Sequence, residues 1–140
     1  MSLWILYALA SATFAALVAI FGKIGIANID STLATTVRAI IMATFLTITS
    51  LILGKGQLLS SINSKALTFI ALSGIAGAMS WLFYFVAIKN GPVNGVAALD
   101  RLSVVFVVIF ASLFLSEALT IKTITGAILL TIGAILMSLK

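Results

Sequence analysis

Two long stretches of this sequence, residues 1–22 and 66–88, contain no charged side chain. A helix needs about 20 consecutive apolar residues to cross the hydrocarbon core of a bilayer, so each stretch is long enough to span a membrane. The composition agrees, because 63% of the 140 residues are hydrophobic and 8% are charged, whereas a soluble domain carries about 25% charged residues. The sequence therefore predicts an all-α membrane protein.

Isolated charges and short polar segments divide the chain into five apolar segments. We predict a single membrane domain with five transmembrane helices, at about residues 3–21, 31–53, 66–88, 92–115 and 121–139. Ser31 or Thr32, after Asp30, is the expected N-cap of the second helix. The first segment lacks the basic start and the cleavage site of a signal peptide, so we expect it to be retained.

Several functional classes are disfavoured by the composition. The net charge is +5, but the basic residues stand singly and form no stripe, so we expect no nucleic-acid partner. The chain has no cysteine, no histidine and three acidic residues. It also lacks a G-x-S-x-G nucleophile motif, so neither an enzyme, a metal site nor a cofactor is expected.

The fourth segment is unusual because Asp100 and Arg101 lie about two turns inside it. Each ionisable side chain at the centre of a membrane helix costs roughly 2.5–3.5 kcal/mol on insertion scales. Such residues face a bundle interior or a water-filled cavity, beside a partner. We therefore interpret residues 91–117 as one membrane-spanning helix that carries the functional site.

Counting membrane crossings places Lys23, Arg38, Asp100 and Arg101 in one half of the membrane. At 1.5 Å per residue, Arg38 and Asp100 each lie roughly 10 Å inside the start of their helix. Their matching depths allow an Arg38–Asp100 contact, in which the carboxylate stays ionised.

Aromatic and hydroxyl side chains fall at the same depth as these charges. The predicted substrate or coupling site therefore comprises Lys23, Arg38, Trp81, Tyr84, Asp100, Arg101 and Ser103. The alternative is a structural ion pair that only holds helices together. Small residues on the third and fifth segments, at Gly74, Gly77, Gly126 and Gly133, predict close helix packing.

Three segments of the chain resemble the EamA-type members of the drug/metabolite transporter superfamily. They are GKIGIANIDSTLATTVRAII, SWLFYFVAIKNGPVNGVAALDRLSVVFVVIFASLFLSEALT and TGAILLTIGAILMSL. More narrowly, the chain resembles the short five-span bacterial and archaeal branch, most specifically around Asp100, Leu102 and Ser103. Arg101 stands where that branch usually has lysine, and Ala98 and Leu99 stand where a proline often precedes the acid, so the resemblance does not imply a kink.

The resemblance implies one half of an inverted-repeat, ten-helix transporter, and hence a homodimer. The implied function is secondary transport of a small metabolite, as efflux or exchange, across the cell (inner) membrane by alternating access in the dimer. The implied partners are a small-molecule solute, the lipid bilayer and a second copy. The alternative function is a structural or accessory membrane subunit in which the buried charges only clamp helices.

Loop lysines are balanced between the two membrane surfaces. Lys55, Lys65 and Lys122 lie on the side of the N-terminus, and Lys23, Lys89 and Lys140 lie on the other side. Because short-loop Lys and Arg residues set orientation, this balance predicts insertion in both orientations. Two oppositely inserted copies would form an antiparallel homodimer.

Overall fold

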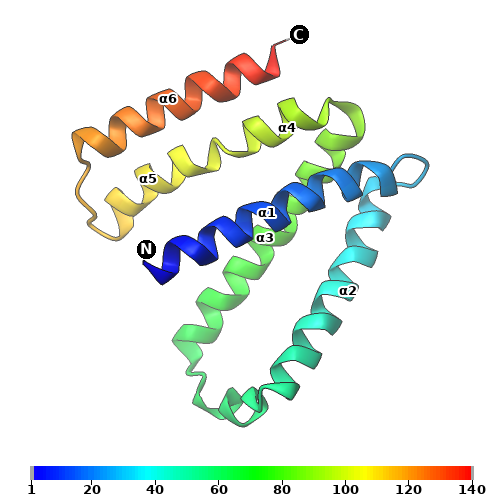
Figure 1. The fold of residues 1–140 in the computed structure, drawn as a ribbon. Coiled ribbons are helices and arrows are strands. Elements are labelled where there is room, and N and C mark those ends of the chain that lie inside the picture. Colours follow the sequence, from blue (N-terminus) through cyan, green and yellow to red (C-terminus); the bar gives the residue numbers. More distant parts are fainter. Residues whose placement is uncertain (1, 140) are drawn as a thin grey trace. The chain divides into compact units, whose positions relative to one another are not determined.

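The computed structural model describes residues 2–139, and these residues form helices and turns with no strand. The helices are α1 (Leu3–Gly25), α2 (Ser31–Ile52), the 3₁₀ helix η1 (Lys55–Ser61), α3 (Ser64–Asn90), α4 (Val93–Asp100), α5 (Ser103–Phe114) and α6 (Ile121–Ser138) (Figure 1).

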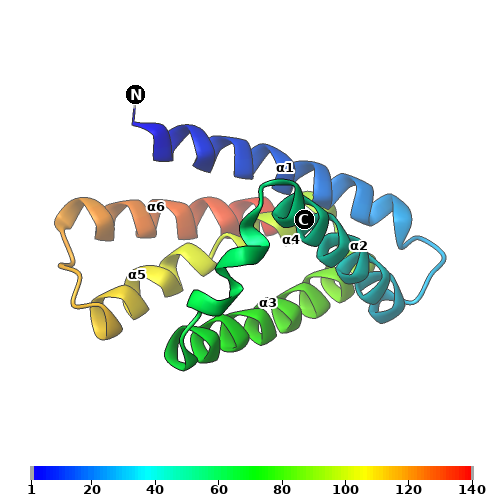
Figure 2. The same ribbon diagram turned by 90° about the horizontal axis from the view of Figure 1, so that it is seen from below.

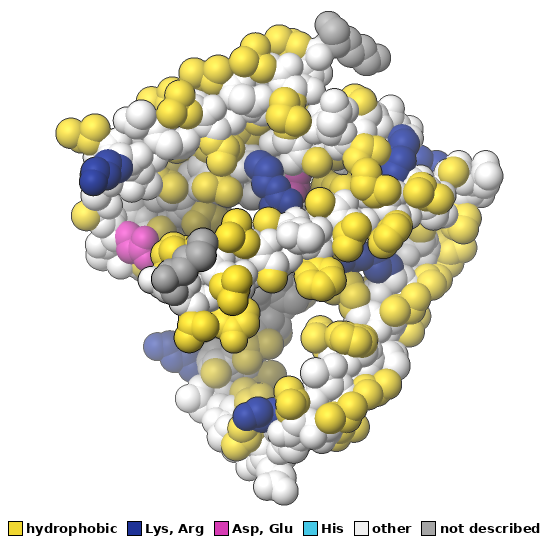
Figure 3. All heavy atoms as spheres, viewed as in Figure 1, with side chains coloured by type: hydrophobic (Ala, Val, Ile, Leu, Met, Phe, Trp, Pro, Cys, Tyr) yellow, Lys and Arg dark blue, Asp and Glu magenta, His cyan; other side chains and the backbone are white. Residues whose placement is uncertain are grey.

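Five helical segments of the described chain are long and apolar enough to cross a membrane. They are α1, α2, α3, the combined α4–α5 segment Val93–Phe114, and α6. The prediction of an all-α protein with five transmembrane helices is therefore confirmed. Hydrophobic side chains are spread over much of the surface visible in Figure 3, as expected for helices that face lipid rather than water.

Internal contacts divide the chain into two units. One consists of Met1–Phe21 with Asn90–Lys140, and we call it the α4–α6 unit. The other, Gly22–Lys89, we call the α2–α3 unit. That all five spans form a single membrane domain stays a prediction.

In the α4–α6 unit, α6 runs alongside both α4 and α5 (Figures 1 and 2). Small residues allow this approach. A Cβ at Gly95 would lie 3.3 Å from Pro92 Cγ and 3.5 Å from both the Met137 carbonyl oxygen and Ser138 Cα. Ala98 on α4 and Ala134 on α6 are buried as well. Helices that pack through such residues bring their backbones close together, as is common in membranes.

The fourth span is interrupted, although the sequence predicts one continuous helix there. The Arg101 amide donates to the Ala98 carbonyl at 3.1 Å, and the Leu102 amide donates to the Leu99 carbonyl at 2.9 Å. The Val104 amide then donates to the Arg101 carbonyl at 3.0 Å. These bonds join residues three apart and so form a tighter 3₁₀ turn between α4 and α5. The interruption comes from this tightened turn and not from a proline.

In the α2–α3 unit, α2 begins at a side-chain cap and is joined through η1 to α3, which runs back in the opposite direction (Figure 1). The Asp30 carboxylate accepts hydrogen bonds from the Thr32 amide at 2.9 Å and the Leu33 amide at 3.0 Å. The N-cap is therefore Asp30, and the prediction of Ser31 or Thr32 is wrong. A carboxylate suits this position because it satisfies free amides and complements the positive end of the helix dipole.

Candidate functional site

Arg38 lies on α2 and reaches the aromatic face of α3. Its guanidinium carbon Cζ is 3.6 Å from the centroid of the Trp81 ring and 5.6 Å from that of Phe85. The Arg38 side chain is half-buried there. A guanidinium over an indole ring gains cation–π energy, more so where water is excluded.

Three aromatic rings of α3 form a cluster behind this arginine. Trp81 and Tyr84 pack edge to face with centroids 5.5 Å apart, and Phe85 lies 5.9 Å from Trp81 and 6.2 Å from Tyr84. The sequence analysis missed Phe85, which is buried. The available signal was its spacing, because residues four apart share a helix face and Phe85 follows Trp81 by four. Gly22 makes room for it, since a Cβ there would lie 3.3 Å from Phe85 Cζ.

Lys23 bridges the end of α1 to the end of α3. Its Nζ donates to the Ile88 carbonyl at 2.6 Å and to the Lys89 carbonyl at 3.2 Å. The last carbonyls of a helix have no partner within that helix, and a cation also complements the negative end of the helix dipole. Lys23 thus caps α3, and its role in binding a solute stays a prediction.

Asp100, Arg101 and Ser103 gather at the interruption of the fourth span. Asp100 is the last residue of α4, Arg101 is its C-cap, and Ser103 is the first residue of α5. All three side chains are exposed in the described structure. Arg101 suits its position at the negative end of α4. Asp100 lies at that same end, which disfavours a carboxylate, and is favoured only by the start of α5 three residues later.

The seven predicted site residues thus fall into two groups. Lys23, Arg38, Trp81 and Tyr84 belong to the α2–α3 unit, whereas Asp100, Arg101 and Ser103 belong to the α4–α6 unit. Arg38 follows the first residue of α2 by seven positions, and Asp100 follows the first residue of α4 by the same number. Their depths along their own helices therefore match, and the Arg38–Asp100 contact stays a prediction.

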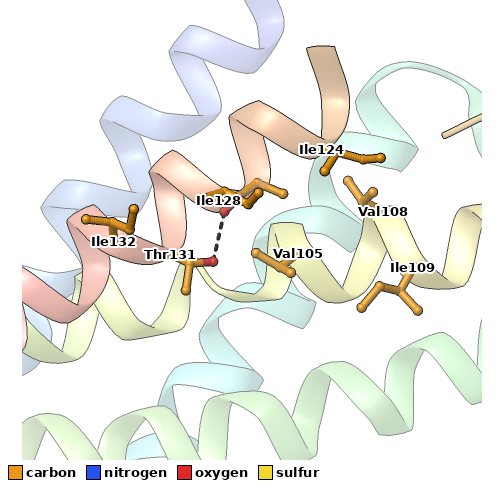
Figure 4. A pocket seen from close by; sticks show the side chains of 8 residues that line it. Val105, Val108, Ile109, Ile124, Ile128, Thr131 and Ile132 are labelled. Atoms are coloured by element: carbon orange, nitrogen blue, oxygen red, sulfur yellow. Dashed lines mark hydrogen bonds between the residues drawn. The ribbon is translucent and has the colours of Figure 1, made fainter. Parts of the chain in front are cut away.

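A groove of about 300 Å³ lies between α5 and α6 (Figure 4). The residues that line it are Val105, Val108, Ile109, Ile124, Ala127, Ile128, Thr131 and Ile132. The Thr131 hydroxyl donates to the Ala127 carbonyl at 2.8 Å, so even the polar side chain of the groove has its hydrogen bond met. The groove therefore suits an apolar occupant.

Four glycines predicted to pack closely have open space around them. A Cβ at Gly74, Gly77, Gly126 or Gly133 would meet no heavy atom within 4 Å. Close packing at these positions is thus not made within either unit of the described residues. Over residues 2–139, no group of three or more His, Cys, Asp or Glu side chains could hold a metal ion.

Comparison with known proteins identifies the family. Residues 2–139 match the EamA-like transporter family. The chain belongs to this family. A Sinorhizobium protein described as "Uncharacterized transporter in cobO 3'region" is 42% identical over 135 residues, which cover 96% of each chain. The "Uncharacterized protein MJ1333.1" of Methanocaldococcus jannaschii is 30% identical over 78 residues, which cover 56% of this chain and 57% of that protein. No solved structure matches.

The resemblance drawn from the sequence motifs is therefore confirmed. As an EamA-like transporter with five apolar helices, the protein is a multi-pass membrane protein that transports a small solute. Family membership points to transport rather than catalysis. The Sinorhizobium relative has nearly the same extent, because the alignment covers 96% of both chains.

Proposed function

We propose that this protein is a secondary transporter that exports or exchanges a small metabolite across the inner membrane by alternating access in a homodimer. The observation that carries the proposal is the interrupted fourth span with Asp100, Arg101 and Ser103 at its break. Transporters place their substrate and ion sites at discontinuous membrane helices, where helix ends and freed backbone groups can bind polar ligands. The site of this proposal comprises these three residues with Lys23, Arg38, Trp81 and Tyr84.

Two features support the homodimer. A Cβ at Gly74, Gly77, Gly126 or Gly133 would have nothing within 4 Å in its own unit, and membrane helices associate through such small residues. The groove between α5 and α6 is lined by apolar side chains, and apolar side chains of a second copy can fill it. An antiparallel pair also fits the balanced loop lysines described above.

The test replaces Asp100 by asparagine, which keeps the size of the side chain and removes its charge. Purified protein in liposomes loaded with a bacterial metabolite extract is given a proton gradient, and released metabolites are measured by mass spectrometry. We expect liposomes with the native protein to release some of the metabolites, and liposomes with Asp100→Asn to release none of these. Glu117→Gln is the matched control, because Glu117 is an acid that lies just after the fourth span. This variant should transport normally.

Assembly is measured on the same samples by size-exclusion chromatography. The proposal requires Asp100→Asn to insert and dimerise like the native protein. Normal transport by Asp100→Asn would refute the site assignment. Failure of that variant to assemble would instead favour the alternative function, an accessory subunit whose charges clamp helices.

A further inference from the structure

The flat face of the Arg38 guanidinium contacts an aromatic ring, whereas its hydrogen-bond donors are unused. Stacking over Trp81 at 3.6 Å engages the flat side of the guanidinium, whereas its five N–H donors point outward in the plane of the group. Within the α2–α3 unit, the Arg38 guanidinium donates no hydrogen bond to a described residue. Arg38 follows the first residue of α2 by seven positions, and α2 is long and apolar enough to cross a membrane. Lipid tails around such a span offer these donors no hydrogen-bond acceptor.

The α2–α3 unit contains no free carboxylate for this arginine. Its single acid, Asp30, accepts the amides of Thr32 and Leu33 at the start of α2. The basic residues of the unit are Lys23, Arg38, Lys55, Lys65 and Lys89. In the α4–α6 unit, Asp100 is followed directly by Arg101. One carboxylate cannot neutralise two arginines, so an Arg38–Asp100 contact would still leave the proposed site with a net positive charge.

The missing partner must carry oxygen acceptors and negative charge. A guanidinium matches the geometry of a carboxylate or a phosphate, with two parallel N–H···O bonds. In a site of low dielectric constant this attraction is stronger than in water. Donors that form no hydrogen bond there cost free energy. An aromatic ring against one face fixes the plane of the guanidinium and hence the direction of its donors.

We propose that the solute is an organic anion whose carboxylate or phosphate binds the guanidinium of Arg38 over Trp81. This inference rests on the proposed transport function and names the substrate class of that site. Trp81 and Tyr84 are partly exposed, whereas Phe85 is buried behind them. The two partly exposed rings can therefore contact the body of the anion, which favours aromatic or apolar carboxylates over small inorganic ions.

The binding test uses Trp81 fluorescence as the reporter. The chain has two tryptophans, and the other, Trp4, is 70% exposed, so Trp4→Phe leaves Trp81 as the single emitter at little structural cost. Protein in a maltoside detergent, which has no phosphate, is titrated at constant ionic strength with sodium benzoate, sodium phosphate or tetramethylammonium chloride. A lipid headgroup carries the same anionic chemistry, so a fourth titration adds phosphatidylglycerol.

We expect a saturable Trp81 response to benzoate, a weaker response to phosphate and none to tetramethylammonium. Arg38→Gln should raise the apparent Kd for benzoate about tenfold or more, since each lost charged hydrogen bond is worth about one power of ten. Arg38→Lys should weaken binding less than Arg38→Gln, because it keeps the charge and loses the planar fork. The matched control Lys65→Gln removes an exposed charge in the first turn of α3 and should leave the Kd unchanged.

Three results would overturn the inference. They are a response to phosphatidylglycerol alone, an equal response in Arg38→Gln, and no response to any anion. Failure of the inference is separable from failure of the transport function. If the liposomes release neutral or cationic metabolites in an Asp100-dependent way while benzoate does not bind, transport stands and the substrate class is wrong. If benzoate binds and no metabolite moves, the anion site stands and transport does not.

Discussion

At the residue scale, Arg38 and Asp100 are two charged side chains at matching depths inside their membrane spans. Each follows the first residue of its helix by seven positions, and Arg38 also stacks on Trp81. The matched depth and the opposite charges were available from the sequence, because they depend on spacing alone. The stacking was not, since it joins residues more than 40 positions apart in the sequence.

A double-mutant cycle tests the Arg38–Asp100 contact. Removing one charge of a buried pair leaves the other unpaired, which costs more than removing both. We therefore expect Arg38→Ala combined with Asp100→Ala to destabilise the protein less than the two single changes summed, with a coupling of roughly 0.5–3 kcal/mol. The free energy of unfolding is measured in detergent by titration with sodium dodecyl sulfate, followed by circular dichroism.

Lys65→Ala combined with Asp100→Ala serves as the control for this cycle, because Lys65 is an exposed residue of the first turn of α3. That pair should be additive. Strict additivity of Arg38→Ala and Asp100→Ala as well would show that the two residues do not interact.

At the element scale, the packing of α4 on α6 depends on the absence of a side chain at Gly95. Its first-turn position in α4 faces the last residues of α6, with Met137 and Ser138 backbone atoms 3.5 Å from a Cβ placed there. The sequence predicted tight packing at Gly126 and Gly133 of the same helix, where the structure has open space. A glycine in the sequence indicates that close approach is allowed, but it does not say which helix approaches.

We expect Gly95→Leu to destabilise the protein by about 1–3 kcal/mol, because the larger side chain must push α4 from α6. Gly95→Ala should change stability less, since its Cβ meets the α6 backbone at 3.5 Å, an ordinary van der Waals distance, and only Pro92 Cγ, at 3.3 Å, must shift by a few tenths of an ångström. The thermal unfolding midpoint in detergent measures both.

Gly25→Leu is the matched control, with the same change at the last residue of α1, a position that has no neighbour within 4 Å and is not one of the glycines of the proposed dimer interface. It should leave the unfolding midpoint unchanged. Equal destabilisation by Gly95→Leu and Gly25→Leu would contradict the packing described here.

At the scale of the whole molecule, orientation in the membrane depends on very few charges. The loop lysines are three against three, of which Lys140 lies outside the described residues. The lysines at 23, 65, 89 and 122 lie within two residues of the end of a span, where they still count as charges near the membrane surface. Arg38 and Arg101 lie about two turns inside their spans and do not count. One additional loop charge should therefore decide the orientation.

Gln57 is an exposed residue of η1, so Gln57→Lys adds a loop charge with little effect on packing. We expect the native chain to insert in both orientations and Gln57→Lys to insert strongly in one. A pair of C-terminal reporters measures this, one active only in the cytoplasm and one only outside. Gln57→Glu is the control and should change little, because acidic residues contribute little to the rule. A single orientation for the native chain would exclude dual insertion and the antiparallel homodimer.

The sequence by itself determined the number and type of the helices. Apolar length and the near absence of charge are local properties, and an apolar stretch of about 20 residues satisfies its backbone hydrogen bonds in a bilayer by forming a helix. The residue types around Asp100 likewise identified the family.

The tertiary structure decided which side chains meet. Three contacts join residues that are far apart in the sequence. They are Arg38 with Trp81, Lys23 with the last carbonyls of α3, and Gly95 with α6. The interruption at Arg101 and Leu102 also appeared only in the hydrogen-bond pattern, because no proline or glycine marks it. Such features depend on distances and bond geometry between neighbours, which an apolar pattern along the chain does not contain.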